Sequence, residues 1–215
     1  MINAIRNNKV MRIPPSDYKP PMYDRLAANY DRALAPLERW FLERLRAHTL
    51  KALPPDGRVL EVGAGTGLNF RYYPTCARGA ATELSGAMID IARAKERPPG
   101  VHLVRNRAEE LPFADDSFDA AVATLVFCSV VSPARAFAEL RRVVRPGGTV
   151  ALLEHVRPAG LLLGYVFDLL NVFTVALFDD HFNRRTADEA RRAGLRTVSV
   201  ESRAFGIIQI IVCRV

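Results

Sequence analysis

The feature that most constrains the fold is a loop with three glycines that follows a short, mostly apolar run. Residues 59–62 read Val-Leu-Glu-Val, and glycine occupies positions 63, 65 and 67. We interpret the run as the first strand of an open α/β sheet and the loop as the turn into a helix N-terminus. Sheets of this kind bind a nucleotide-like cofactor at such a turn.

The glycine spacing excludes two common nucleotide-binding motifs. The dinucleotide fingerprint needs its third glycine at position 68, which is Leu68. The phosphate-binding loop of nucleoside triphosphatases needs a Gly-Lys-Ser/Thr ending, which this loop lacks. Glycine at 63 and 65 lets a ligand approach the backbone closely. Glu83 ends the second expected strand, where an acidic residue can accept hydrogen bonds from two ribose hydroxyls.

Apolar runs and helical patterns alternate along the rest of the chain. We expect strands at 58–62, 79–83, 101–105, 118–124, 149–154, 195–200 and 207–214, and helices within 23–52, 85–95, 133–144 and 186–193, with a break at Pro36. This alternation with a closing pair of strands predicts a mainly parallel sheet with helices on both faces. At 215 residues, one domain over 23–215 follows a basic, amphipathic segment over 1–22.

The composition is that of a globular protein, but it does not identify a binding partner. A hydrophobic fraction of 49% is that of an ordinary globular protein. The three cysteines lie far apart and no histidine–cysteine spacing suits a metal, so we predict reduced thiols and no metal site. Residues 1–18 lack the apolar core of a secretory signal. The net charge of +7 fits an anionic membrane surface, nucleic acid or simple solubility.

Several motifs together resemble the class I S-adenosylmethionine-dependent methyltransferases. They are Glu61-x-Gly63-x-Gly65-x-Gly67, Glu83, the Leu-Pro-Phe and Asp-Ser-Phe-Asp strings within 111–119, and the stretch 140–148 that ends in Arg-Pro-Gly-Gly. The resemblance is to the type 11 branch, which includes the ubiquinone/menaquinone methyltransferases, and it runs from about Tyr23 to the C-terminus. It implies a Rossmann-like seven-stranded sheet, S-adenosylmethionine as methyl donor and S-adenosylhomocysteine as product.

The same resemblance implies which residues hold the cofactor. Residues 23–31 are similar to the helix that closes over the cofactor, with Tyr30 near the methyl donor; Tyr30 is otherwise a packing residue. Asn106-Arg107-Ala108-Glu109 stands where relatives usually have Gly-Asp-Ala-Glu. Arg107 cannot accept a hydrogen bond from the adenine amino group, which leaves that contact to the backbone at Ala108. The expected cofactor set is Tyr30, Glu61, Gly63, Gly65, Thr66, Gly67, Glu83, Leu84, Met88, Asn106, Ala108, Glu109 and Leu125.

Three later strings narrow the resemblance. Residues 124–130, residues 153–156 and His181-x-Asn183-Arg184-x-Thr186 resemble bacterial phospholipid N-methyltransferases and membrane-associated thiol methyltransferases. An ammonium acceptor must lose a proton, so a nearby base or carbonyl helps. We expect Tyr30, His155 and His181 to be catalytic, and Asn183, Arg184 and Arg185 to bind the substrate, with an arginine at the lipid phosphate. The alternatives are structural histidines and a solvated helix start at Arg184–Arg185.

The strongly apolar stretch 160–178 bears on the choice of acceptor. Asp168 and Asn171 fall in its middle, so we do not expect it to span a membrane. It is either a lid over the acceptor pocket or a helix in the membrane interface.

These observations predict methyl transfer from S-adenosylmethionine to the amine of phosphatidylethanolamine and its methylated intermediates, which is phosphatidylcholine synthesis. We expect a cytoplasmic protein attached peripherally to an anionic membrane surface, with no nucleic-acid partner. One alternative is a methyltransferase acting on a small lipophilic thiol or a quinone-like phenol. The other is a catalytically silent, basic nucleic-acid-binding module, against which the chain shows no basic patch interleaved with aromatic residues. The oligomeric state is left open.

Overall fold

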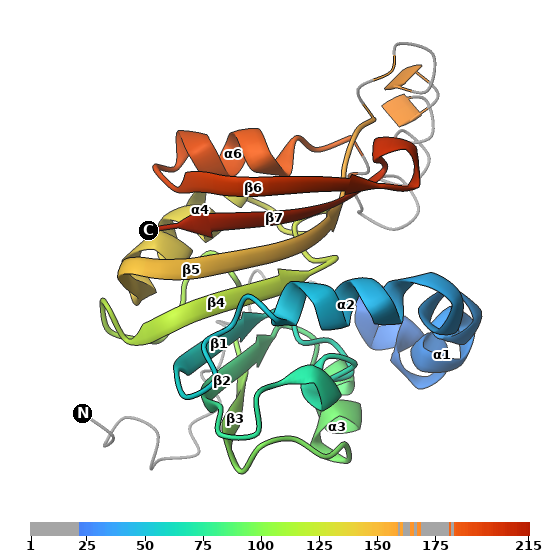
Figure 1. Ribbon diagram of the computed structural model, residues 1–215. Coiled ribbons are helices and arrows are strands. Elements are labelled where there is room, and N and C mark those ends of the chain that lie inside the picture. Colours follow the sequence, from blue (N-terminus) through green and yellow to red (C-terminus); the bar gives the residue numbers. More distant parts are fainter. Residues whose placement is uncertain (1–21, 159, 161–163, 166, 169–180, 182) are drawn as a thin grey trace, which may run out of the picture.

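The computed structural model describes residues 22–158, 160, 164–165, 167–168, 181 and 183–215. They form one seven-stranded sheet in the order β3-β2-β1-β4-β5-β7-β6 (Figure 1). The strands are β1 (Arg58–Val62), β2 (Arg78–Glu83), β3 (Gly100–Arg105), β4 (Phe118–Thr124), β5 (Val144–His155), β6 (Arg196–Arg203) and β7 (Ile208–Arg214). Strands β1 to β5 run parallel, whereas β7 is antiparallel to both β5 and β6. The predicted α/β sheet is confirmed.

Helical segments cover both faces of this sheet. They are α1 (Met22–Leu37), the π-helical turn η1 (Glu38–Leu42), α2 (Glu43–Leu50), η2 (Phe70–Tyr72), α3 (Gly86–Arg93), α4 (Pro133–Val143), α6 (Thr186–Arg192) and η3 (Ala204–Gly206). A buried cluster under α4 and α6 contains Leu60 and Phe137, and a cluster on the other face, under α2 and α3, contains Val59 and Leu50. Neighbouring residues of β1 therefore face opposite cores, which is why this strand reads as apolar rather than alternating.

Two boundaries differ from the sequence expectation. Strand β5 begins at Val144, because that residue pairs with Phe118 directly after α4 ends. The predicted break at Pro36 is wrong, since the chain stays helical through the proline and widens into the π-turn η1. Proline has no N–H to donate, and a π-turn is one way in which a helix accommodates an irregular hydrogen-bond ladder.

A third apolar cluster joins the N-terminal helices to the C-terminal hairpin. Leu45, Leu153, Ile208 and Ile210 form its buried part, and Phe41, Leu125 and Ile207 pack against it. The cluster lies where β5 ends and β7 begins, at the right-hand end of the sheet in Figure 1.

None of the helices in the described ranges combines the length and apolarity needed to cross a bilayer. Residues 1–21 of the predicted N-terminal segment and most of the apolar stretch 160–178 lie outside the described residues.

Candidate functional site: a cofactor cradle and a neighbouring acceptor side

The glycine loop after β1 adopts a backbone that only glycine accepts easily. Gly63, Gly65 and Gly67 all have positive φ, at 68°, 55° and 82°. A Cβ atom at Gly63 would lie 2.5 Å from the Val126 side chain, and one at Gly67 would collide with the Phe70 ring. A Cβ atom at Gly65 would meet nothing within 4 Å. The loop therefore presents its backbone to open space at Gly65, while Gly63 and Gly67 are needed for packing.

Glu83 faces this loop from the end of β2. One carboxylate oxygen accepts the Gly65 N–H at 2.9 Å and the other accepts the Ser85 N–H at 2.8 Å. Burial raises the pKa of Glu83, and these two hydrogen bonds partly offset the rise. A carboxylate oxygen has a second lone pair, so each oxygen retains the capacity to accept a ribose hydroxyl.

Two carboxylates of helix α1 bind it to the glycine loop and to the two ends of α3. Asp24 accepts hydrogen bonds from the Ser85 hydroxyl and, at 3.3 Å, from the Ala87 N–H. Asp31 accepts from Thr66 Oγ1 at 2.5 Å and from Lys95 Nζ at 2.6 Å. Tyr30, which precedes Asp31, therefore lies in a helix held against the glycine loop. Residues 23–31 thus occupy the position expected of a closing helix.

Glu61 is a correction to the predicted cofactor set. Its side chain is fully buried, and it accepts hydrogen bonds from Asn69 Nδ2 at 2.5 Å and from the Tyr73 hydroxyl. Burial raises its pKa. Its side chain has no exposed surface and both of its oxygens accept protein hydrogen bonds, so Glu61 supports the loop from behind.

Arg46 of α2 belongs to the same buried network and was missed from the sequence. Its NH1 donates to Thr124 Oγ1 at 2.6 Å and to Asn69 Oδ1 at 3.2 Å, and its NH2 donates to Glu38 Oε1 at 2.8 Å. The network joins the N-terminal helices to the ends of β1 and β4. An arginine among the apolar positions of a helix was the only sequence signal for it.

The string Asn106-Arg107-Ala108-Glu109, expected near the adenine, forms the turn after β3. The Asn106 N–H donates to the Glu83 carbonyl at 3.0 Å, and Glu109 accepts the Ser132 N–H at 3.1 Å. The Arg107 side chain lies 3.8 Å from the Glu109 carboxylate. Leu84 leads into α3, and the Met88 side chain packs inside the protein with 2% exposure. Glu109 is thus engaged by the protein, and Ala108 is half-buried between it and Arg107.

A second set of groups surrounds the loop after β4. Leu125 has a φ of 58°, unusual for a branched residue, and its N–H donates to the Leu153 carbonyl. The fully buried Glu154 stabilises the loop by accepting the N–H groups of Val126 at 3.1 Å and Phe127 at 3.2 Å. Burial raises the pKa of Glu154 to about 8. Sequence reasoning had assigned Glu154 no role.

The predicted acceptor residues come together beside this loop, with one correction. The His181 N–H donates to the Cys128 carbonyl at 2.9 Å. Burial, with a smaller contribution from the Arg184 charge, lowers the pKa of His155 to about 4, so its ring is neutral at pH 7. Arg184 donates to the backbone carbonyls of Phe127 and, at 2.7 Å, Val130. Arg184 therefore fixes the loop, which leaves the exposed Arg185 as the remaining candidate for the phosphate contact that the sequence predicts for one of the two arginines.

Asn183 lies on the outer side of this cluster. Its Nδ2 is 3.5 Å from Asp168, which forms an ion pair of 2.8 Å with Arg157.

Comparison with known proteins agrees with this geometry. The family described as "Methyltransferase domain" matches residues 60–152. A demethylmenaquinone methyltransferase from Roseiflexus sp. is 34% identical over 160 residues, which is 70% of this chain and 67% of that protein. A phosphatidylethanolamine N-methyltransferase from Cereibacter sphaeroides is 38% identical over 103 residues, covering 46% and 51% of the two chains. The solved structure of a SAM-dependent methyltransferase from Thermotoga maritima has a TM-score of 0.68 at 25% identity, over 89% of this chain and 97% of that one.

A sheet of this order, with a glycine loop after β1 and a carboxylate after β2, defines a Rossmann-like nucleoside-binding domain. The chain belongs to the class I S-adenosylmethionine-dependent methyltransferases, in the type 11 branch. Its matches span 58% to 67% of the length of the first curated relatives. Family and fold imply S-adenosylmethionine as the cofactor. The open space at Gly65 and the available lone pairs of Glu83 fit a ribose-bearing ligand.

Proposed function

We propose that this chain transfers a methyl group from S-adenosylmethionine to a lipophilic acceptor, and that the acceptor is the amine of phosphatidylethanolamine and of its methylated products. The methyl-transfer part of this proposal is supported by the hydrogen bond from the Gly65 N–H to the Glu83 carboxylate, at the ends of β1 and β2. As part of the same proposal, the protein works at an anionic membrane surface in the cytoplasm.

The chain's contribution on the cofactor side is orientation. S-adenosylmethionine, when bound, supplies an electrophilic methyl group on a sulfonium. Glu83 would accept the ribose hydroxyls, the Gly65 backbone would lie against the ligand, and α1 with Tyr30 would exclude water. Methyl transfer is an in-line displacement, so alignment of donor and acceptor is the main task of the protein.

On the acceptor side, the chain offers a neutral imidazole next to a buried loop. His155 follows Glu154 at the end of β5, and its lowered pKa keeps the imidazole uncharged at neutral pH. A ring with so low a pKa is a poor proton acceptor, so His155 would orient the acceptor by accepting a hydrogen bond from it. His181, which bonds to the loop after β4 through Cys128, is the candidate for taking the proton that an ammonium must lose.

The amine acceptor is supported by the 38% identity to the phosphatidylethanolamine N-methyltransferase. A quinone-like phenol is the second candidate, because the demethylmenaquinone methyltransferase matches a larger share of the chain, 70% against 46%. A phenolic acceptor also has to lose a proton, so a base at His181 would serve either acceptor. A lipid phosphate, by contrast, needs a cation such as Arg185, and a phenol does not.

The test is to incubate purified protein with methyl-labelled S-adenosylmethionine and, separately, phosphatidylethanolamine vesicles, a demethylated menaquinol and a lipophilic thiol. We expect label in the phospholipid, lost in Glu83→Ala and reduced in Arg185→Ala. Label in the quinol or thiol alone, unaffected by Arg185→Ala, would overturn the acceptor while leaving methyl transfer intact. No label in any acceptor, with the cofactor bound, would reject the proposal as a whole.

A further inference from the structure

Two aromatic side chains project from one end of the molecule into solvent. Phe205 is 94% exposed and Trp40 is 86% exposed, the two highest values among the large apolar side chains in the described ranges. Trp40 lies in the π-turn η1, and Phe205 lies at the tip of the β6–β7 hairpin. Neither residue contributes to a core or to the site described above.

The backbone conformation is unusual both at Phe205 and at Trp40. Ala204, Phe205 and Gly206 have φ values of 48°, 57° and 85°, so the hairpin tip holds consecutive left-handed residues, of which only the last is glycine. Such a backbone is disfavoured for alanine and phenylalanine. Trp40 lies in a π-turn, a feature that is often associated with function. The fold therefore presents these two rings outward at some cost.

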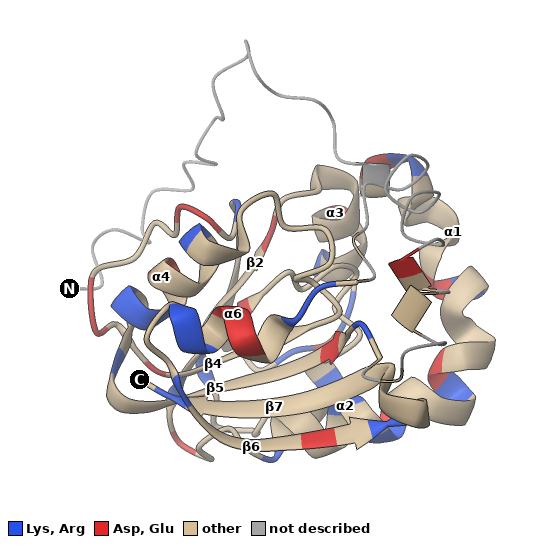
Figure 2. Cartoon of the chain, turned by 90° about the horizontal axis from the view of Figure 1, so that it is seen from above, with Lys and Arg blue, Asp and Glu red and all other residues tan. Residues whose placement is uncertain are grey.

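The two aromatic residues belong to one surface. Phe41, next to Trp40, and Ile207, two residues after Phe205, pack against the same buried cluster. The α1–α2 junction and the β6–β7 hairpin tip lie at the same end of the molecule in two perpendicular views (Figures 1 and 2). Leu125, on the acceptor side of the site, packs against that cluster too. The two segments that carry the exposed rings therefore adjoin the same buried cluster as Leu125.

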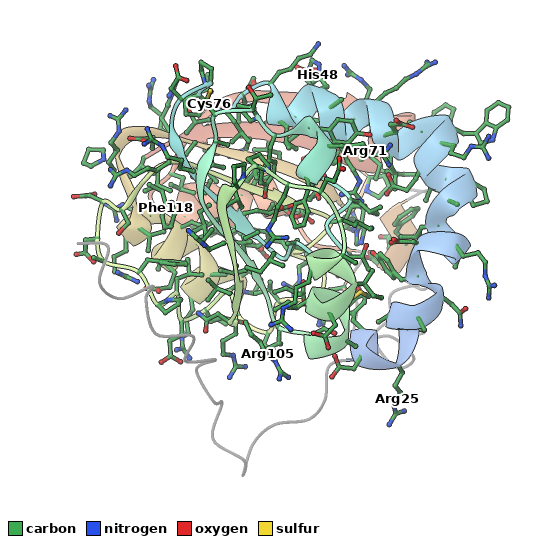
Figure 3. All side chains as sticks on the ribbon, turned by 90° about the horizontal axis from the view of Figure 1, so that it is seen from below. Arg25, His48, Arg71, Cys76, Arg105 and Phe118 are labelled. Atoms are coloured by element: carbon green, nitrogen blue, oxygen red, sulfur yellow. The ribbon has the colours of Figure 1, made fainter. Side chains whose placement is uncertain are left out.

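Among the described residues, the surplus charge at this end is positive. Three acidic side chains here have arginine partners: Glu38 pairs with Arg46 at 2.8 Å, Glu43 with Arg71 at 3.4 Å, and Glu201 with Arg203 at 2.6 Å. Figure 3 shows His48 and Arg71 on the side of the molecule that carries α2. Arg39 and Arg44 are exposed, and neither forms an ion pair with a residue that the structure describes. Exposed aromatic tips next to surplus arginine match a bilayer interface with anionic headgroups.

We propose that Trp40 and Phe205 are paired insertion tips that dock this end of the protein on an anionic lipid surface. A lipophilic acceptor then enters the site from the bilayer side. This inference rests on the membrane attachment in the proposed function and adds the residues that make the contact, but it does not depend on which acceptor is methylated. Its partner is the lipid surface itself, recognised by interfacial aromatic rings and by arginine.

The chain carries its own reporter, because Trp40 is the only tryptophan among the 215 residues. Its fluorescence is measured with vesicles of phosphatidylcholine containing phosphatidylglycerol, with pure phosphatidylcholine vesicles, and without lipid. With anionic vesicles we expect a blue shift of the Trp40 emission, quenching by acyl-chain-brominated lipid, and weakening by salt. Phe205→Ala lowers vesicle partitioning by roughly tenfold, as expected for partial burial of one aromatic ring. Val198→Ala, at an exposed position near the other end of β6, is the matched control and leaves partitioning unchanged.

A second variant keeps the test decisive. In a Trp40→Phe background, Phe205→Trp places the reporter at the hairpin tip, and we expect the same blue shift and quenching there. An unshifted emission with anionic vesicles, or equal partitioning of Phe205→Ala and the parent chain, would refute the docking surface. A blue shift that grows with protein concentration in the absence of lipid would instead identify a second copy of the chain as the occupant. The measurement needs neither cofactor nor acceptor, so its result is separate from that of the methyl-transfer assay.

Discussion

Replacing Glu83 with glutamine tests the cofactor cradle most directly. Both carboxylate oxygens accept a backbone N–H, from Gly65 at 2.9 Å and from Ser85 at 2.8 Å. Glutamine has one acceptor oxygen, so one of these N–H groups would face an amide NH₂. An unsatisfied buried donor costs about 1–3 kcal/mol, and a hydrogen bond to a charged group is worth about 1.5–3 kcal/mol. The unsatisfied N–H should lower the stability of Glu83→Gln by about 1–3 kcal/mol. The lost charged hydrogen bond to the ligand should weaken binding by about 1.5–3 kcal/mol, or roughly 10- to 150-fold in Kd.

The assay is calorimetric titration with S-adenosylhomocysteine, with the melting temperature recorded for each variant. Glu96→Gln makes the same chemical change at an exposed position after α3 and serves as the control. We expect the control to bind like the parent chain. A Glu83→Gln variant that is folded and binds within threefold of the parent would refute the assignment of Glu83 to the ribose.

Three further outcomes follow from the buried groups. Burial raises the pKa of Glu154 from 4.5 to about 8, so the folded state keeps a proton that the unfolded chain loses. The free energy of unfolding should therefore fall as pH rises from about 4.5 to 8, and this slope should shrink in Glu154→Gln in urea titrations at several pH values. Gly63→Ala, with a φ of 68° and a contact of 2.5 Å with Val126, should destabilise the fold by about 2–4 kcal/mol, with part of the loss recovered by Val126→Ala in thermal melts. Arg46→Leu leaves the buried carboxylate of Glu38 without its partner and should lower the free energy of unfolding by about 3–5 kcal/mol. The double variant with Glu38→Leu should recover most of this loss. Equal melting temperatures of the single and double variants would contradict this reasoning.

The sheet could be predicted from the sequence because its signals are local. The glycine loop, the apolar runs and the Arg-Pro-Gly-Gly turn each fix a strand or a boundary by backbone chemistry alone. The same local reasoning was wrong at Pro36. Whether a helix breaks or widens at a proline depends on what lies beside it, and here the Arg46–Glu38 pair bridges the widened turn.

The site could be predicted only where the function of a residue follows from its place on the backbone. Glu83 and Gly65 were recognised because strand ends and glycine turns mark their positions. The internal contacts of Glu61 and Arg184 could not be predicted, because neither a motif nor a charge shows which protein groups a side chain meets. Their partners, Asn69, Tyr73 and the carbonyls of Phe127 and Val130, come together only through the tertiary fold.

The fastening of α1 has a consequence for turnover. Asp24 is bound at the first residues of α3, and Asp31 is bound at Lys95, just beyond the end of α3. Helix α1 therefore spans the cofactor cradle and is held at two points. We expect cofactor exchange to require the release of at least one of these two attachments. The Asp31–Lys95 pair is partly exposed, so salt screens it. We therefore expect the residence time of S-adenosylhomocysteine to shorten as ionic strength rises. The rate of product release should then depend on the salt concentration of the medium.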